Sequence, residues 1–597
     1  MKKLQNTGLI FIVTAIVGFT IIPFFQNFTL TEAAISGDSV FHGRAMIESA
    51  KEHGIIGKTY SSNISLINDL NQVIQESSAA LSHQYEAGLK PEEVEEWDFK
   101  IGSWKKDQYL LKIVRNSETG MLKNHPLFFL LFITGVGIFG AALFIIPLFY
   151  TIPGIKNNKI YHQEMTKGTT LAIRKILLSL LIPGVLLYGV VYMQNEWLWP
   201  AITLVMTGLI TYFVFIKEKS IERNPQRSAS VSKTGYLGMI MGVYLISFYI
   251  TLYWAPEYIT GWMSMLDPLS LALNGGPASQ WFVYGFLYTL IVLIMGVRMV
   301  AKYRHSRYQM LRTGSVIFFQ TGFAFLIPEI LVRLNQPWFD FKNIWPLNYS
   351  FFFDWNLNQL ISSGGLGIFM LVWGIILIFV GVPLLTYFYG KRWYCSWVCG
   401  CGGLAETLGD PYRQLSDKSL RAWQYERYIV HGVLVFAVVM TVLVLYTFIT
   451  GSASLLFLSS DTLRGWYGFL IGSAFAGVAG TGLYPIMGNR VWCRYGCPLA
   501  AYLGLVQKFK SRFRITVNGG QCISCGNCST YCEMGIDVKW YAQRGQDIVR
   551  ASCVGCGICS EVCPRGVLRL ENNSSDLHLR THTLRTLNLD TDTIQIK

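Results

Sequence analysis

Long apolar stretches alternate with short polar loops along most of the chain. Ten stretches have about the 17 to 25 residues that a helix needs to cross the hydrocarbon core of a bilayer. They lie near 7–25, 126–151, 176–194, 198–216, 235–254, 281–300, 314–334, 364–389, 428–450 and 465–487. The pattern therefore predicts a mainly α-helical protein, a polytopic transmembrane bundle of about ten helices.

Positive charge in the loops predicts the orientation of this bundle. Lys2 and Lys3 precede the first apolar run, which has no convincing cleavage site, so we expect a retained anchor with a cytoplasmic N-terminus. Basic residues gather in alternate loops: Lys156, Lys159, Lys167, Arg174 and Lys175, then Lys217, Lys219, Arg223 and Arg227, then Lys302, Arg304, Arg307 and Arg312. The connections 195–197, 255–280 and 451–464 carry few. The positive-inside rule then places both termini in the cytoplasm, with the protein in a bacterial inner membrane.

Composition supports a lipid environment. Hydrophobic residues make up 52% and charged residues 14% of the 597, against about 25% charged in soluble proteins. The net charge of +14 belongs to the loops and does not indicate nucleic acid. We expect residues 27–125 to form a small, mostly helical external domain, a packing or docking module without a cofactor. That segment has no CxxCH motif for covalent haem c and no motif for covalent FMN.

The thirteen cysteines all lie between residues 395 and 563, and eight of them form two C-x2-C-x2-C-x3-C runs. This spacing is typical of bacterial two-cluster ferredoxins, in which the fourth cysteine of each run binds the other cluster. We therefore predict one [4Fe-4S] cluster on Cys522, Cys525, Cys528 and Cys563, and another on Cys553, Cys556, Cys559 and Cys532. Structural zinc does not require this repeated register. Glu533 stands where the first run would have proline, which weakens that pattern slightly.

An internal repeat contains four more cysteines. Residues 390–400 match 488–498 in Gly, Arg, aromatic and Cys positions, and each segment follows an apolar run at its cytoplasmic end. If these stretches are helical, the i, i+4 spacing places both sulfurs of a pair on one face. Cys395, Cys399, Cys493 and Cys497 would then hold a third cluster or another thiophilic metal, act as redox dithiols, or simply pack as buried cysteines. Cys401 is expected to be a spare buried thiol.

These motifs together resemble the NosR/NapH-type polyferredoxin membrane proteins over about residues 364–597. The resemblance implies electron transfer linked to quinol. The chain departs from the family pattern at Gly400 and Cys401, where the first pair lacks the following proline, and in lacking the flavin-attachment motif of the NosR branch.

A few polar residues inside the apolar runs are further candidates. Glu329 and Arg333 lie four residues apart on one helix face, where they would border a quinone site or a proton path, or form a structural ion pair. His431 is the only histidine well inside an apolar run, so a bis-histidine haem is not expected. His125 is expected at the interface.

The predicted plan has six parts: an anchor (1–26), the external domain (27–125), helices two to seven (126–363), helices eight to ten with the C-x3-C repeats (364–514), an α+β ferredoxin-like domain (515–570) and a polar tail (571–597). We expect one-electron transfer between the quinone pool or a cytoplasmic donor and an external reductase or cytochrome of anaerobic respiration. All recognised ligands lie at the inner face, so that route needs a quinone, another membrane cofactor or a partner subunit. The alternatives are a maturation factor that reduces a metal or disulfide, and a protein whose clusters only stabilise its fold.

Overall fold

Helices dominate the part of the chain that the structure describes, which confirms the predicted mainly α class. The computed structural model describes residues 2–36, 40–87, 101, 103–151, 225–452, 454–455, 458–518, 521–572, 587–590 and 593–596. The chain divides into two compact units. The N-terminal unit comprises Met1–Thr151, Ile250–Leu290 and Glu329–Asn335, and the C-terminal unit comprises Ile152–Tyr249, Ile291–Pro328 and Gln336–Lys597.

Six helices among the described residues are long and apolar enough to cross a membrane, which supports a multi-pass protein. They are Lys3–Ile21, Pro126–Tyr150, Gln280–Tyr303, Arg307–Arg333, Gly364–Tyr389 and Leu420–Thr450. The predicted runs 176–194 and 198–216 lie outside the described residues. Run 235–254 contains the shorter apolar segment Ile240–Trp254, and run 465–487 is broken into several elements. The count of ten therefore stays a prediction.

Two apolar helices of the N-terminal unit, α1 (Lys2–Ile21) and α8 (Pro126–Thr151), pack closely along each other. Glycines permit this approach: a Cβ atom on Gly140 would lie 2.7 Å from the Cβ of Phe11, and one on Gly8 would lie 2.7 Å from the carbonyl oxygen of Gly140. Small residues that bring helix backbones together are typical of packing within membranes.

Between α1 and α8 the chain forms a small domain around its own apolar core. Its helices are α2 (Glu32–Ile35), α3 (Val40–Glu52), α4 (Asn63–Glu86), α6 (Ser103–Asn116) and α7 (Met121–Asn124). Its antiparallel sheet has the order β2–β1–β3, built from β1 (Asn27–Thr29), β2 (Thr59–Tyr60) and β3 (Glu118–Thr119). Phe28, Leu66 and Leu70 are fully buried in its core. Two further elements of the same unit are η3 (Pro256–Ile259) and α12 (Thr260–Leu273).

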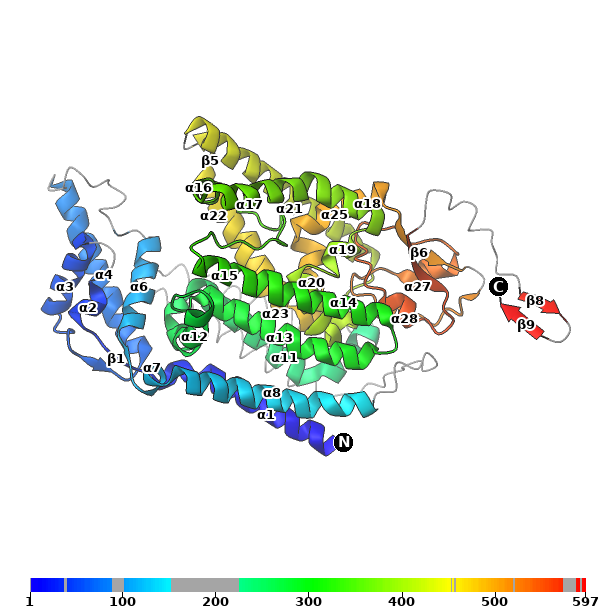
Figure 1. Ribbon diagram of the computed structural model, residues 1–597, viewed down its shortest axis with the longest axis horizontal. Helices are drawn as coiled ribbons and strands as arrows, with labels where there is room; N and C mark the ends of the chain where they lie inside the picture. The colour runs from blue at the N-terminus through cyan, green and yellow to red at the C-terminus, as the bar shows by residue number, and fades with distance from the viewer. Residues whose placement is uncertain are drawn as a thin grey trace. The chain divides into compact units, whose positions relative to one another are not determined.

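Long helices make up much of the described part of the C-terminal unit. Its apolar elements include α14 (Arg307–Phe318) and η4 (Phe319–Leu326). They continue into α15 (Ile327–Arg333), which belongs to the N-terminal unit from Glu329 onward. The span formed by α17 (Gly364–Ile376), η5 (Leu377–Gly381) and α18 (Val382–Tyr389) follows, and then α21 (Leu420–Thr450). The chain also contains α11 (Pro225–Trp254), α13 (Gln280–Tyr303) and α16 (Asp354–Ser362). After α21 come β4 (Ser454–Leu455), β5 (Leu458–Ser459), α22 (Ser460–Tyr467), the π-helix η7 (Gly468–Ala479), α23 (Gly480–Gly482) and α24 (Tyr484–Met487). In Figure 1, β6, α27 and α28 of the same unit gather beyond the ends of α14 and α18.

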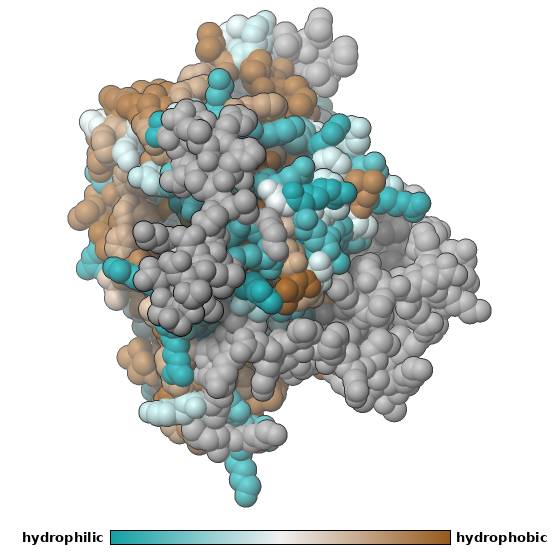
Figure 2. All heavy atoms as spheres, turned by 90° about the vertical axis from the view of Figure 1, so that its right-hand side faces the viewer, coloured by the Kyte–Doolittle hydropathy of each residue, from teal (hydrophilic) through white to brown (hydrophobic). Residues whose placement is uncertain are grey.

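Those elements belong to a small α+β domain with an internal repeat. Strands β6 (Phe513–Val517) and β7 (Leu568–Asn572) pair antiparallel, with Ile515 opposite Leu570. Helices α26 (Asn527–Thr530) and α28 (Ile558–Glu561) each follow a glycine in the left-handed region, and α27 (Val538–Gln543) lies between them. Strands β8 (Leu587–Asp590) and β9 (Thr593–Ile596) form a separate hairpin. Figure 2 faces this end of the chain and shows hydrophilic side chains gathered there, with apolar side chains along the margin.

Candidate iron–sulfur centres

The two C-x3-C segments adopt matching backbone paths. Each begins at a glycine with positive φ, 68° at Gly390 and 94° at Gly488. The second cysteine of each pair then donates its backbone N–H five residues back, from Cys399 to Tyr394 at 2.8 Å and from Cys497 to Trp492 at 2.9 Å. Neither segment is one regular α-helix, so the conditional prediction of i, i+4 sulfurs on a single helix face does not apply.

Both second cysteines lie at the start of a helix. Cys399 precedes α20 (Gly400–Thr407), and Cys497 precedes α25 (Pro498–Lys510). The Cys497 sulfur also accepts a hydrogen bond from the backbone N–H of Ala500 at 3.4 Å. Helix N-termini favour negative charge, so both helices would help to stabilise a metal-bound thiolate at these positions.

The four sulfurs of the repeat lie close to one another. Cys395, Cys399, Cys493 and Cys497 are all buried. Burial raises the pKa of Cys497 well above its ordinary value, and the neighbouring Cys493, Cys399 and Cys395 raise it further. Burial likewise raises the pKa of Cys395 to about 12. Four thiolates gathered in a dry site are favourable only beside a cationic centre, which is the chemistry of a soft-metal or cluster site.

The ferredoxin-like domain brings its cysteines together in the two crossed sets that the spacing predicts. One small cavity is lined by Cys522, Cys525, Cys528 and Cys563. A second cavity is lined by Cys532, Cys553, Cys556 and Cys559. Burial raises the pKa of Cys528 to about 12 and that of Cys553 to about 11. Each cavity thus combines three cysteines of one run with the fourth of the other.

Residues with a left-handed backbone conformation shape both ferredoxin loops in the same way. Ser524 and Gly555 have φ of 58° and 62°, and Gly526 and Gly557 have φ of 79° and 78°. Ser524 is the only one of these that is not glycine, and its hydroxyl accepts a hydrogen bond from Gln543 at 2.8 Å. Positive φ lets a short loop turn its cysteines toward a common centre.

A buried network of charged side chains links the repeat to the second ferredoxin cavity. Glu406 forms ion pairs with Arg312 at 2.5 Å, Arg413 at 2.7 Å and Arg490 at 2.6 Å. Arg490 also lies 3.6 Å from the Cys493 sulfur, while Arg413 lies 3.9 Å from the Cys556 sulfur. The two cysteine sites therefore share one electrostatic environment.

Glu533 closes this network from the ferredoxin side. Its carboxylate lies 2.8 Å from Arg413 and 3.2 Å from Arg490, and it accepts a hydrogen bond from Asn489 at 3.2 Å. Glu406, Glu533 and Cys556 are close enough to hold a metal ion. Since the arginines already neutralise both carboxylates, we interpret this group as an ion network. Sequence reasoning treated Glu533 only as a missing proline.

Unpartnered donors in the network show that its residues fit an anionic group. Within the described part of the chain, Nε and Nη2 of Arg312 and Nε of Arg490 are buried without a hydrogen-bond partner. Burial and the two nearby glutamates raise the pKa of Cys556, whereas Arg413 and Arg312 lower it. Cysteine-ligated iron–sulfur clusters carry net negative charge, and N–H donors to sulfur are their usual partners.

Hydrogen bonds attach the loop of the second ferredoxin run to the helices. Gln309 donates to the carbonyl of Cys556 at 2.9 Å, and Tyr308 to that of Gly555 at 2.8 Å. Ser396, inside the first C-x3-C segment, donates to Val554 at 2.8 Å. These contacts hold the second ferredoxin cavity beside the repeat.

Cys401 is partly exposed and not fully buried as the sequence predicted, and its role as a spare thiol stays a prediction. A hydrogen bond from Cys401 is the largest cause that lowers the pKa of Cys399, to about 6. Cys401 lies at the start of α20, beside the four-cysteine set.

The other predicted candidates occupy separate environments. In the N-terminal unit, Glu329 accepts a hydrogen bond from Asn274 at 2.7 Å and Arg333 donates to the carbonyl of Ala272 at 2.6 Å. Both therefore contact the end of α12, and their role at a quinone site stays a prediction. His431 bonds the Arg427 carbonyl at 2.6 Å and lines a large cavity, which sequence reasoning did not find. His125 caps the short helix α7.

Comparison with known proteins supports iron–sulfur chemistry at both kinds of motif. Residues 371–419 and 469–516, which contain the C-x3-C pairs, match a family model described as "4Fe-4S binding domain". Residues 521–568 match one described as "4Fe-4S dicluster domain". The C-terminal part of this chain resembles membrane ferredoxin-type proteins. This confirms the resemblance predicted from the sequence, over part of the chain.

Three curated relatives support the same resemblance to ferredoxin-type proteins. The chain is 27% identical to the putative electron transport protein YccM of Escherichia coli, over 27% of this chain and 45% of the relative. It is 28% identical to the methylamine utilization ferredoxin-type protein MauN of Methylorubrum extorquens, over 26% of the chain and 52% of the relative. It is 30% identical to protein NirI of Paracoccus denitrificans, over 30% of the chain and 26% of the relative. The matches thus span about half or less of each relative's length, and no solved structure matches the chain.

Proposed function

We propose that this protein carries single electrons at the inner face of a bacterial inner membrane. In this proposal it links the quinone pool or a cytoplasmic donor to an external respiratory reductase. The observation that supports it best is the buried Arg–Glu network that joins the repeat to the second ferredoxin cavity. A protein that kept its clusters only for folding would not need two cysteine sites to share buried cations.

The proposal assigns three [4Fe-4S] sites. The first two use the crossed sets Cys522, Cys525, Cys528 and Cys563, and Cys553, Cys556, Cys559 and Cys532. The third uses Cys395, Cys399, Cys493 and Cys497, and the match of both C-x3-C segments to a 4Fe-4S family favours it over redox dithiols or packing. Such clusters, when bound, supply one-electron transfer.

In this proposal the three sites are neighbours in space: the first ferredoxin cavity, the second ferredoxin cavity and the repeat. Cys528 contributes to the raised pKa of Cys559, so the two ferredoxin cavities are neighbours. Lys391 lowers the pKa of Cys395, Cys493 and Cys553, against the larger effect of burial, and therefore lies near both the repeat and the second cavity. Lys391 is only 2% exposed, and its ammonium donates a hydrogen bond to the Ala551 carbonyl at 3.2 Å.

Iron content and reduction kinetics test the proposal. The full chain, purified anaerobically, should contain about twelve iron atoms, since each cubane has four. Cys395→Ser and Cys493→Ser should each lower this to about eight and slow quinol-linked reduction of the ferredoxin-like domain. Eight iron atoms in the unaltered protein, or unchanged kinetics in both variants, would contradict the third site. Turnover too slow for respiration would favour a maturation factor.

A further inference from the structure

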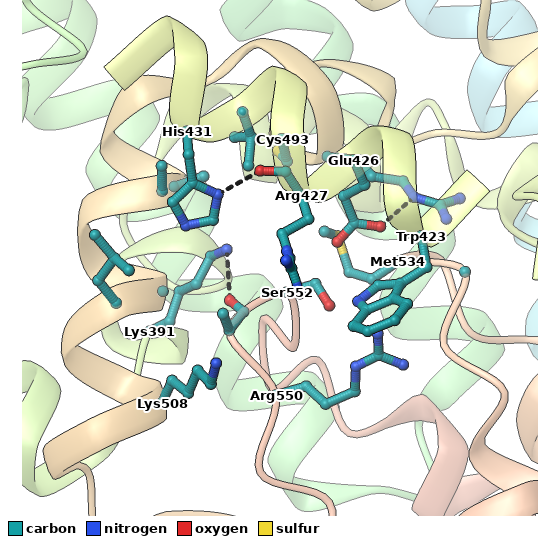
Figure 3. A pocket seen from close by; sticks show the side chains of 18 of the residues that line it. Lys391, Trp423, Glu426, Arg427, His431, Cys493, Lys508, Met534, Arg550 and Ser552 are labelled. Carbon is teal, nitrogen blue, oxygen red and sulfur yellow. Dashed lines mark hydrogen bonds and ion pairs between the residues drawn. The ribbon is translucent and has the colours of Figure 1, made fainter. Parts of the chain in front are cut away.

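A large cavity in the C-terminal unit lies apart from the cysteine sets except at one wall. Its volume is about 1090 Å³, and it is bounded by the first turns of α21, by α25 and by segments of the ferredoxin-like domain. In Figure 3, Lys391 and His431 point toward one another on one side of the view, Lys508 points in from α25, and Arg550 lies beside Trp423.

Positive charge dominates the lining. Six cationic side chains line the cavity, Lys391, Lys418, Arg427, Arg494, Lys508 and Arg550, against the two carboxylates of Glu426 and Asp537. Glu426 is already paired with Arg494 at 2.7 Å, and Asp537 caps α27 and accepts from Ser529. Among the ion pairs of the described residues, none includes Arg427, Lys508 or Arg550. The cavity thus offers excess positive charge to an anion.

The mouth of the cavity has the character of a membrane interface. Its α21 residues belong to the first turns of an apolar span. Leu420, Tyr428 and Phe509 line it and are 65%, 68% and 69% exposed. Exposed aromatic rings beside cations at the end of a membrane helix are typical of the level of lipid headgroups.

We propose that this cavity binds the phosphate headgroup of an anionic phospholipid, with the acyl chains along the apolar face of α21. Arg427, Lys508 and Arg550 contact the phosphate, and the exposed Val435 and Val442 continue the surface toward the hydrocarbon. Basic pockets between membrane helices bind such headgroups in this way. A free phosphate has the same charge but would gain nothing from the apolar strip, so we commit to the lipid.

Native mass spectrometry of the delipidated full chain, titrated with phosphatidylglycerol, tests the site. Phosphatidylglycerol should bind more tightly than phosphatidylcholine, and Arg427→Gln, Lys508→Gln and Arg550→Gln should each weaken its binding about five-fold. Arg421→Gln and Lys510→Gln are matched controls, because both side chains are exposed and neither lines the cavity. The controls should keep the affinity of the unaltered protein.

Each other outcome overturns the proposal. Equal binding of the two lipids would exclude recognition of the anionic headgroup. Unchanged affinity in all three cavity variants would place the lipid elsewhere, and inorganic phosphate that competes as well as the lipid would show a free-anion site. Iron content measured on the same samples verifies folding, and it also separates this result from failure of the proposed electron transfer.

Discussion

Nη1 of Arg490 lies 3.6 Å from the sulfur of Cys493. The same guanidinium contacts Glu406 at 2.6 Å and donates to the Cys395 carbonyl at 3.0 Å. One buried side chain therefore neutralises a carboxylate, fixes the backbone of the first C-x3-C pair and presents an N–H to a sulfur of the second. Positive charge at this position stabilises the reduced, more negative state of a cluster.

Arg490→Gln should make the reduction potential of the third site more negative. Loss of one charge-assisted hydrogen bond of about 1.5 kcal/mol corresponds to about 60 mV for one electron. A redox titration followed by electron paramagnetic resonance measures it. Arg494→Gln is the control, since Arg494 is also buried but pairs with Glu426. Equal shifts in both variants would assign the effect to general loss of charge.

Glu533→Gln should destabilise the protein although it removes no cysteine. The change leaves Arg413 and Arg490 with only part of their buried negative charge, and breaking a buried pair costs about 3 to 5 kcal/mol. The melting temperature of the purified chain should fall clearly. Glu571→Gln, on the partly exposed strand β7, should change it little. A melting temperature that is unchanged in Glu533→Gln would mean that the network adds no stability.

The contrast between the cysteines and Glu533 shows what the sequence could reveal. Cysteine spacing predicts both crossed sets, because loop geometry dictates which thiols converge, and the repeat predicts a second cysteine site. Glu406 and Arg413 meet Arg490 and Glu533 only through tertiary packing of segments that are distant in sequence, so no local pattern predicts the network. The cationic cavity was missed for the same reason, since α21, α25 and residue 550 are distant in sequence.

Asp410 should keep its stabilising contribution down to strongly acidic pH. Burial raises its pKa, but Lys302, Arg413 and Arg298 lower it, and the net pKa lies below the ordinary 3.8. When the pKa of a carboxyl group is lower in the folded state, its contribution to stability is fully present at pH values above the unfolded-state pKa. That contribution is lost as the pH falls through the folded-state pKa. The difference in melting temperature between the unaltered protein and Asp410→Asn should therefore be constant from about pH 7 to about pH 5. A difference that shrinks in this interval would contradict the ion pairs.

The final prediction separates Cys401 from its neighbour Cys399. If Cys399 is a ligand and Cys401 only donates to it, Cys399→Ser should lose about four iron atoms while Cys401→Ala loses none. Cys401→Ala removes the donor and should shift the potential of the third site to more negative values, because hydrogen bonds to ligand sulfurs stabilise the reduced state. Cys401→Ser keeps an O–H donor at this position and should largely restore the potential. Loss of iron in Cys401→Ala with retention in Cys399→Ser would exchange the two roles and make Cys401 the ligand.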